Sequence, residues 1–200
     1  MFKAGFLFYP LLCGALAWGA AAPRPFEAQG KWGYQDGQGK TVIPPRYEVA
    51  QPFLPEGIAA VVDASGWAYI DAQGRVVIRP FVFDNGPDYF RQGLARFVAG
   101  GKFGFFDRRG RVVIAARFDF ALPFSEGLAA VCLGCREVAE GEHKAMRGGQ
   151  WGFVNRQGEL VIAARFQEAE SFEKGRARVK VGGQWGYINP RGAPLAGHPE

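Results

Sequence analysis

The sequence is poor in the residue types on which most catalytic and metal sites depend. It has two histidines, three cysteines and three serines among 200 residues. It contains no Gly-x-Ser-x-Gly nucleophile elbow, no phosphate-binding glycine loop and no His-Glu-x-x-His zinc motif. Three cysteines are also too few for a disulfide scaffold. The sequence therefore predicts a protein that is not an enzyme and that uses no cofactor.

The sequence also lacks any sustained apolar period of 3.6 residues, so we expect almost no helix. Apolar residues make up 48% of the chain and aromatic residues 14%, which excludes disorder for most of it. The 29 glycines and 13 prolines are spaced along the chain rather than clustered, as in a protein with many turns. These features favour an all-β fold.

The N-terminus has the layout of a secretory signal peptide. Lys3 precedes an apolar stretch over residues 6–18, and small residues follow. The stretch is shorter than the roughly 20 residues of a membrane-spanning helix, although an uncleaved anchor is the alternative interpretation. We expect residues 1–21 to be a leader and residues 22–29 to be a short mature N-terminal tail. The protein is then expected in the periplasm or outside the cell.

The cleavage site falls among Gly19, Ala21 and Ala22, with the last disfavoured because Pro23 follows it. The net charge of +5 permits attraction to an anionic polymer of the envelope, but a charge of this size is also ordinary. Nucleic acid is not an expected partner, because the chain is expected to be exported and has no Lys/Arg-rich segment that could bind phosphate groups. The membrane is expected to contact the chain only through the leader before cleavage.

A short aromatic motif occurs five times in the chain. Each copy has an aromatic residue, a glycine or alanine, and a second aromatic residue. The first aromatic residues of successive copies are 35, 36, 48 and 34 positions apart, so the third interval carries extra residues. Because they recur so regularly, we expect these first aromatic residues to form the repeat core: Trp32, Trp67, Phe103, Trp151 and Trp185.

Each motif leads into a turn that begins with Asp or Asn and ends with Gly, as in Asp36–Gly39. The first side chain accepts hydrogen bonds from the turn backbone, and the glycine adopts a positive φ without steric cost. A β-branched run such as Thr41–Ile43 comes next, followed by a linker, a glycine and a further strand such as Ile58–Val61. This order predicts a three-stranded antiparallel meander for each unit.

Alternation assigns the two faces of the strand that follows each linker glycine. Its alanines at 59, 95, 129 and 177 share a face with larger apolar residues two positions later, and that face is expected to be core. The opposite face carries several cationic residues, which we take as a candidate binding surface: Arg96, Arg176, Arg178 and Lys180.

A unit of this size cannot bury its own sheet, so the core must form between stacked neighbours. We therefore expect an all-β tandem array of about five three-stranded antiparallel units over residues 30–195, followed by a C-terminal tail at 196–200. An open solenoid or superhelix of hairpins is favoured. Three strands per unit and a truncated fifth copy do not suit the alternative, which is closure as a propeller.

These motifs are similar to the WG repeats, also called KWG repeats. The resemblance rests on Lys31-Trp32-Gly33-Tyr34, on the Asp-x-x-Gly turns, on the Val-Ile runs and on the segment Pro123–Ala129. It covers about residues 30–195, and Ala68 and Phe103 depart from the motif. The resemblance implies a bacterial origin and a β-rich repeat array. It implies no catalytic residue and no agreed ligand.

The long third interval contains an insertion at residues 132–149, which opens with Cys132 and Cys135. A structural disulfide between them is favoured, because it fits an oxidising compartment and the even number of cysteines left after the leader. Unpaired structural thiols and a redox-active Cys-x-x-Cys pair are alternatives. A metal site is a further alternative, with the ligands Cys132, Cys135, His143 and either Glu140 or Glu142.

Three functional hypotheses follow from these features. The first is a non-enzymatic exported repeat module that mediates protein–protein interaction at the bacterial envelope. The second is a module that binds glycan or peptidoglycan through exposed aromatic rings. The third is a metal- or redox-active protein that uses the Cys-x-x-Cys insertion. The tryptophans discriminate between the first two, because buried rings indicate core and a solvent-facing row favours sugars.

Overall fold

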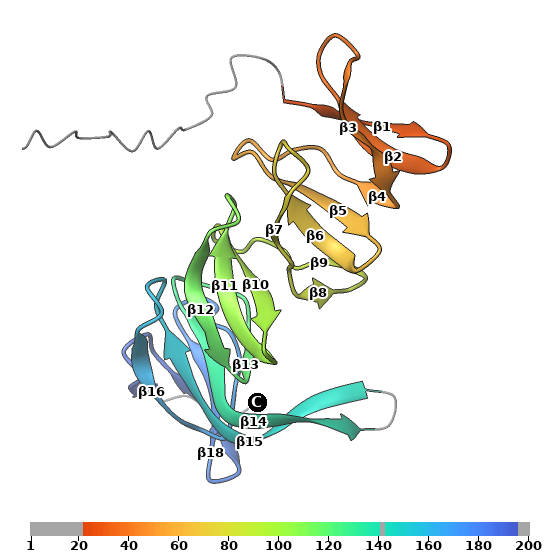
Figure 1. Ribbon diagram of the computed structural model, residues 1–200. Helices are drawn as coiled ribbons and strands as arrows, with labels where there is room; N and C mark the ends of the chain where they lie inside the picture. The colour runs from red at the N-terminus through yellow and green to blue at the C-terminus, as the bar shows by residue number, and fades with distance from the viewer. Residues whose placement is uncertain (1–21, 141–142, 196–200) are drawn as a thin grey trace, which may run out of the picture.

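The computed structural model describes residues 22–140 and 143–195, where all regular structure is β-strand (Figure 1). The expected leader at 1–21 and C-terminal tail at 196–200 lie outside these residues. In the described part of the chain, no helix is long and apolar enough to cross a bilayer. The strands are β1 (Arg24–Ala28), β2 (Lys31–Gln35), β3 (Thr41–Tyr47), β4 (Val49–Ala50), β5 (Ala59–Asp63), β6 (Gly66–Ile70), β7 (Val76–Ile78), β8 (Val82–Phe83), β9 (Gly86–Pro87), β10 (Leu94–Ala99), β11 (Lys102–Asp107), β12 (Val112–Phe118), β13 (Phe120–Ala121), β14 (Ala129–Glu140), β15 (His143–Val154), β16 (Leu160–Phe166), β17 (Glu168–Ala169), β18 (Ala177–Val181), β19 (Gln184–Ile188) and β20 (Pro194–Leu195).

Five antiparallel sheets follow one another along the chain. The first is β1-β2-β3 and the third is β10-β11-β12, which the small hairpin β8-β9 precedes. The second, fourth and fifth sheets add a short strand in front of the meander, giving β4-β5-β6-β7, β13-β14-β15-β16 and β17-β18-β19-β20. The three-stranded meander is thus confirmed as the repeated unit.

The first sheet begins earlier than the sequence indicates. Residues 24–28, expected to lie in the N-terminal tail, form β1 and pair with β2 from Arg24 opposite Gln35 to Ala28 opposite Lys31. No linker glycine precedes this segment, so it lacks the signal that marks the equivalent strand in the other units. The array therefore starts at Arg24 rather than at residue 30.

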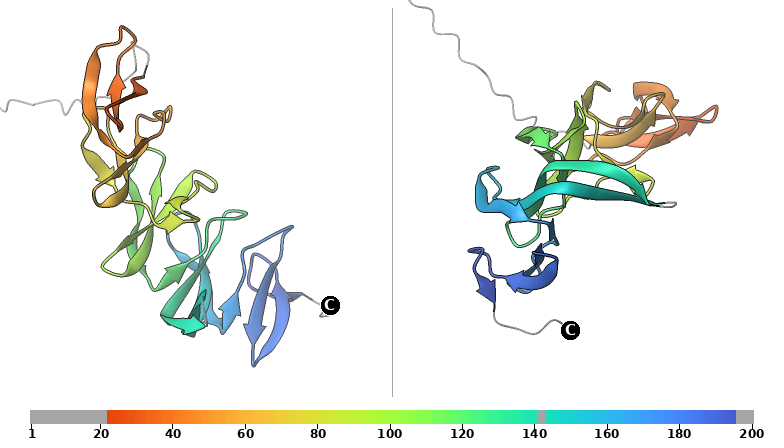
Figure 2. Two further views of the ribbon diagram at one scale, coloured as in Figure 1. Left: turned by 90° about the vertical axis from the view of Figure 1, so that its right-hand side faces the viewer. Right: turned by 90° about the horizontal axis from the view of Figure 1, so that it is seen from below.

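The sheets stack in an open row, with the first and fifth sheets at opposite ends (Figure 2). The favoured open array is therefore confirmed, and the propeller alternative is not observed. One segment departs from the row. The distal part of the hairpin β14-β15 projects away from the stack (Figure 1).

A hydrophobic cluster fills each junction between neighbouring sheets. In the second sheet, Val61 and Ile70 pack toward the first sheet, whereas Ala60 and Tyr69 pack toward the third. A middle sheet therefore buries both of its faces, as the apolar residues on both faces of the aromatic strand indicate. Stability is shared between neighbours, since no unit encloses a core of its own.

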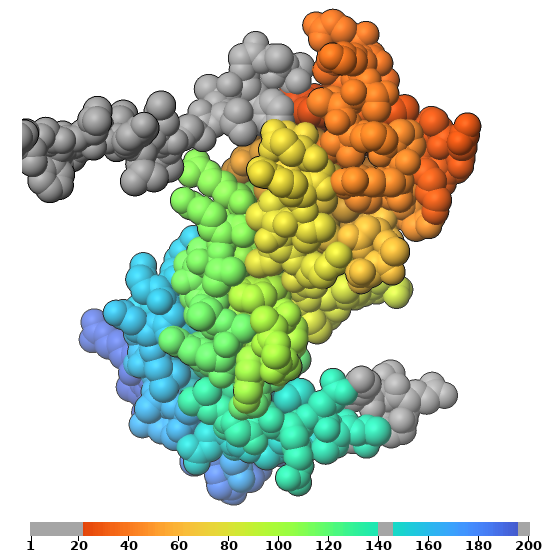
Figure 3. Space-filling view, viewed as in Figure 1, coloured from red at the N-terminus to blue at the C-terminus, as the bar shows by residue number. Residues whose placement is uncertain are grey.

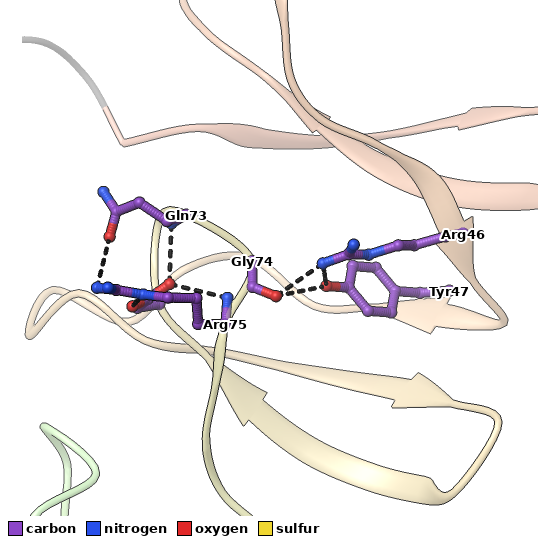
Figure 4. Close-up of polar contacts among 6 residues, drawn as sticks. Arg46, Tyr47, Gln73, Gly74 and Arg75 are labelled. Carbon is purple, nitrogen blue, oxygen red and sulfur yellow. Dashed lines mark hydrogen bonds and ion pairs between the residues drawn. The ribbon is translucent and has the colours of Figure 1, made fainter.

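An arginine–aromatic pair at the end of the third strand clamps three of the four junctions. Arg46 Nη2 donates to the carbonyl oxygen of Gly74 at 2.7 Å, and its guanidinium lies 5.1 Å from the Tyr47 ring centroid (Figure 4). Gly74 ends the Asp-x-x-Gly turn of the next sheet, so the clamp fixes one unit against the turn of its neighbour. The same contact joins Arg117 to Gly158 and Arg165 to Gly192.

The glycine of the aromatic motif is required because the third strand crosses directly over it. A Cβ on Gly152 would lie 2.6 Å from the Ile162 carbonyl oxygen, and the equivalent position in Gly33 is equally crowded. In the second sheet the third strand stops at Ile78, and here alanine replaces glycine at Ala68. The departure of this copy from the motif thus has a steric reason.

Candidate binding groove

The projecting hairpin leaves the fourth sheet at the position where other sheets make a tight glycine turn. In the third and fifth sheets, Gly100-Gly101 and Gly182-Gly183 connect the two strands, all with positive φ. Gly148 and Gly149 have the same conformation, with φ of 73° and 63°, but in the fourth sheet the projecting hairpin lies between β14's first residues and these two glycines. A Cβ on Gly149 would lie 2.4 Å from the Cys135 backbone nitrogen, so this crossing demands glycine.

A disulfide between Cys132 and Cys135 fixes the bend at the base of the hairpin. Both residues are buried, and their Cα atoms lie 5.9 Å apart on either side of Gly134, whose φ is 81°. The Gly134 N–H also donates to Asp119 Oδ2 at 2.6 Å. The bend is thus held covalently and by a carboxylate.

The disulfide occupies both sulfur atoms that the metal alternative would use. Among residues 22–140 and 143–195, no group of three His, Cys, Asp or Glu residues gathers in a metal-binding arrangement. The side chains of Glu140 and His143, like Glu142, lie outside the described residues. The described residues therefore support the structural disulfide.

Replacing both cysteines by serine is expected to loosen residues 132–149 and to leave most of the fold intact. The bridge closes only a tiny loop, so its entropic effect on the unfolded chain is small, and its main role is to hold the bend. Hydrogen exchange should show faster exchange in the hairpin with unchanged protection in the first three sheets. Loss of protection in all five sheets would show instead that the disulfide stabilises the whole array.

Asp119 makes the bend sensitive to acid. Its hydrogen bond with Lys102 holds the pKa of the carboxyl below its usual range, and the Gly134 N–H lowers it further. Because the folded-state pKa is the lower one, this contribution to stability is present above about pH 4 and is lost as the pH falls through the folded pKa.

Asp119→Asn is therefore expected to destabilise the protein at about pH 6, and its effect should shrink as the pH falls through the folded-state pKa of Asp119, below which the wild-type carboxyl is also neutral. Urea unfolding of both proteins across this range measures the difference. A difference in unfolding free energy between the two proteins that stays constant at every pH would contradict the role assigned to the Asp119 charge.

A groove of about 620 Å³ lies between the hairpin and the fifth sheet, and we call it the hairpin groove. Figure 3 shows how the hairpin stands clear of the body of the molecule. The lining combines apolar residues of the fourth and fifth sheets, and Phe81 just before β8, with ionisable residues from the hairpin and the fifth sheet: Phe81, Phe120, Glu137, Met146, Arg147, Trp151, Glu168, Ala169, Glu170 and Trp185.

The floor of the groove is aromatic and its rim is charged. The Phe120 and Trp151 rings meet edge to face with centroids 6.0 Å apart. On the rim, Glu168 accepts a hydrogen bond from Lys180 at 2.9 Å and lies 3.9 Å from Arg147. The described lining thus brings aromatic rings beside carboxylates and a guanidinium, groups that can contact a ligand by stacking, hydrogen bonds and ion pairs.

The first aromatic residues of the motif divide into two groups. Phe103 and Trp151 are core residues with exposed fractions of 8% and 6%, as predicted. Trp32, Trp67 and Trp185 are only half-buried, so the prediction of a buried core ring is wrong for them. The first aromatic residue lies at the start of its strand, near the rim of the sheet. The ring two positions later lies at mid-strand and is deeper, as in Tyr34.

Arg96 does not belong to an exposed surface, which corrects the sequence-based assignment. It is 4% exposed and its Nη2 donates to Asp88 Oδ1 at 2.7 Å, while Nε donates to Oδ2 at 2.9 Å. Its Nη1 donates to the Ala121 carbonyl oxygen in β13, so the ion pair also joins the third sheet to the fourth. The next sheet covers this face in every unit except the last.

The other three predicted cationic residues lie on the outer face of the fifth sheet. Arg176 is exposed and lies 4.7 Å from the Tyr187 ring centroid, and Arg178 lies 4.5 Å from that of Trp185. Lys180 also faces Trp185. These cations cover two rings that another sheet would cover in the middle of the array. They act as a polar cap on the terminal repeat.

Sequence reasoning missed the arginine clamps and Asp88. The clamps had a signal, since an arginine followed by an aromatic residue occurs three positions after the isoleucine in three units. Asp88 had none, because it follows the small hairpin β8-β9, which the described residues of the other units lack and which the sequence pattern does not indicate. The groove likewise depends on which segments the fold brings together.

A model of the WG-containing repeat family matches four stretches that cover more than half of the chain: residues 32–63, 67–103, 103–134 and 151–185. Residues 135–150, between the last two stretches, form the projecting part of the β14-β15 hairpin. No curated protein and no solved structure matches the chain.

Proposed function

The chain belongs to the WG-containing repeat family, and from this premise we propose that it is an exported, non-catalytic module that binds a protein partner through the hairpin groove. The stacked sheets form the scaffold. The hairpin and the fifth sheet form the site.

The hairpin groove carries this proposal. It joins an aromatic floor at Phe120 and Trp151 to a rim that bears both signs of charge, a combination typical of protein recognition sites. Its outer wall is the segment where the chain departs from the regular repeat. Binding residues are commonly placed on such departures from a uniform scaffold.

The motif aromatics form no continuous solvent-facing row, which favours a protein partner over a glycan. Sugar-binding surfaces present a row of rings to solvent. Here Trp32, Trp67 and Trp185 are half-buried, and Phe103 and Trp151 between them are buried between sheets. The leader-like N-terminus and the Cys132–Cys135 disulfide both suit an exported protein in an oxidising compartment.

A shortened hairpin provides the sharpest test. Deleting residues 134–147 joins Leu133 to Gly148-Gly149 and recreates the glycine turn of the third and fifth sheets. Cys132→Val accompanies the deletion, since valine occupies this position at Val62 and Val98. The variant should fold with a similar melting temperature and lose its partner.

The assay is site-specific photo-crosslinking in envelope extracts, with the reactive side chain at Met146 in the groove. A matched probe at Val42, which is 47% exposed on the first sheet, serves as the control. We expect a protein adduct at position 146 that is absent at position 42 and that the shortened chain, added in excess, does not compete away. Recovery of polysaccharide alone would reject the protein-binding function.

A further inference from the structure

The Asp/Asn-x-x-Gly turns of successive sheets lie along one margin of the array, which we call the turn edge. From the second sheet onward, each turn packs on the third strand of the preceding sheet. A Cβ built on Gly74 would lie 3.2 Å from Ile43 Cγ2, and one on Gly158 would lie 3.0 Å from Ile114 Cγ2. Figure 1 shows the turns following one another, from the orange turn before β3 to the blue turn before β16. The turn edge comprises four turns and the first residues of the strands after them: 36–42, 71–77, 107–113 and 155–161.

The turn edge exposes a row of large apolar residues. They lie just before the buried isoleucine of the third strand, which is an outer strand in each of these sheets. Their exposed fractions run from 40% to 54%: Val42, Val76, Val77, Val112, Val113, Leu160 and Val161. Single exposed apolar residues are ordinary, but a row that continues across four units marks an interaction surface.

The exposed charge beside this row is cationic, because the turn carboxylates face inward. Asp71 Oδ1 accepts the Gln73 and Arg75 N–H groups, so the Asp71 side chain is only 22% exposed, whereas its ion-pair partner Arg75 is 75% exposed. The third sheet repeats this arrangement, with Asp107 at 17% and Arg111 at 68%. The carboxylates thus serve the turn backbone, and the guanidinium groups reach the solvent.

Further exposed cations lie in the turns or contact them. The clamp arginines donate to carbonyl oxygens of the turns, which leaves their positive charge in place. Two acidic residues oppose this charge, since Glu159 is exposed and Glu56 pairs with Arg108. The cations outnumber them: Lys40, Arg46, Arg109, Arg117, Arg156 and Arg165.

We propose that the turn edge binds the surface of a membrane that contains anionic phospholipids. The negative potential of such a surface attracts the cations, and the exposed valines enter the headgroup region and leave water. A soluble anionic polymer would use the cations but not the apolar row. The turns are the tips of their hairpins, so they reach a flat surface without the need for a pocket.

This contact is additional to the one expected for the leader, and it does not depend on the hairpin groove. Its test therefore uses the chain from residue 22 onward, because the apolar stretch at 6–18 would bind lipid by itself. The described residues from 22 onward hold all five sheets. The assay is flotation with vesicles of phosphatidylcholine, either alone or mixed with phosphatidylglycerol in about a 3:1 ratio.

We expect the wild type to float with the mixed vesicles at about 0.1 M salt and not with phosphatidylcholine alone. Arg75→Gln combined with Arg111→Gln should fold normally, because both ion pairs are exposed, and should weaken binding at least about tenfold. Val76→Thr combined with Val112→Thr keeps the charge and the β-branching and should weaken binding about threefold or more.

The matched control is Lys31→Gln combined with Arg79→Gln, which removes the same net charge from two other exposed ion pairs. These pairs lie at the opposite ends of the strands, since Lys31 begins β2 and the Arg79 partner Asp63 ends β5. The control and the shortened-hairpin variant should bind the mixed vesicles as the wild type does. Equal weakening by the two charge variants would overturn the proposal, because net charge alone would then explain the binding.

A fluorescent label gives a second readout. An environment-sensitive dye on Val112→Cys should shift to the blue with mixed vesicles, whereas the same dye on Val181→Cys should not. Val112 is 54% exposed at the turn edge, and Val181 is 58% exposed at the opposite ends of the strands. Equal shifts at both positions would overturn the proposal, and so would equal binding to phosphatidylcholine alone. Binding of a soluble anionic polysaccharide that the threonine variant retains in full, without vesicle binding, would assign the edge to a polymer instead.

Discussion

Replacing Asp88 by alanine is expected to lower the free energy of unfolding by about 3–5 kcal/mol, the cost of leaving one partner of a buried ion pair without the other. Asp88 is 2% exposed and Arg96 is 4% exposed. The carboxylate accepts from the Arg96 guanidinium through both oxygens and from the Arg96 backbone N–H at 2.8 Å. The variant leaves the Arg96 guanidinium beside the Phe81 ring, 4.9 Å from its centroid, without its carboxylate acceptor.

An exposed ion pair is the control. The Arg75 side chain is 75% exposed and pairs with Asp71 on the surface, so Arg75→Ala should change stability by no more than about 1 kcal/mol. The double variant Asp88→Leu with Arg96→Met removes both charges together and should recover much of the loss. Urea unfolding measures all three. An Asp88→Ala cost as small as that of Arg75→Ala would contradict the buried pair.

The ion pair shows why the sequence predicted the face of Arg96 but not its surroundings. Alternation along β10 correctly separates Ala95 from Arg96, because side chains alternate across a strand. What covers each face depends on the next sheet and on Asp88 after the β8-β9 hairpin, neither of which local periodicity describes. Arg96 shares this face with Arg176 and Arg178 of the fifth unit, so the sequence alone indicates an exposed cationic surface.

The repeat and its turns were predictable because their signals are local. In the first unit, the Asp36 carboxylate accepts the Gln38 and Lys40 N–H groups, and Gly39 has φ of 81°. These roles follow from side-chain length and steric freedom alone. The hairpin groove was not predictable, because Phe81 and Trp185, which lie over 100 positions apart in the sequence, meet in it only after the sheets have stacked.

Trp151→Ala is expected to lower the free energy of unfolding by about 3–5 kcal/mol, as for other buried large aromatic residues. The ring is 6% exposed at the junction between the fourth and fifth sheets. It packs against Phe120 and Met146, and Phe166 pairs with it across the sheet. The vacated volume lies against a rigid disulfide-bonded bend, so the neighbours can relax into it only in part.

Trp185→Ala is the matched variant, since the same residue type occupies the same motif position in the fifth sheet but is half-buried and caps the array. Its cost should be less than half of that for Trp151→Ala, because less apolar surface is exposed on truncation. Hydrogen exchange should locate the Trp151→Ala loss in the fourth and fifth sheets and spare the first two, as nearest-neighbour coupling in a stacked array requires. Equal losses of unfolding free energy for the two variants would contradict the prediction that burial of the ring determines the loss. Uniform loss of protection along the chain would show that the five sheets unfold as one unit.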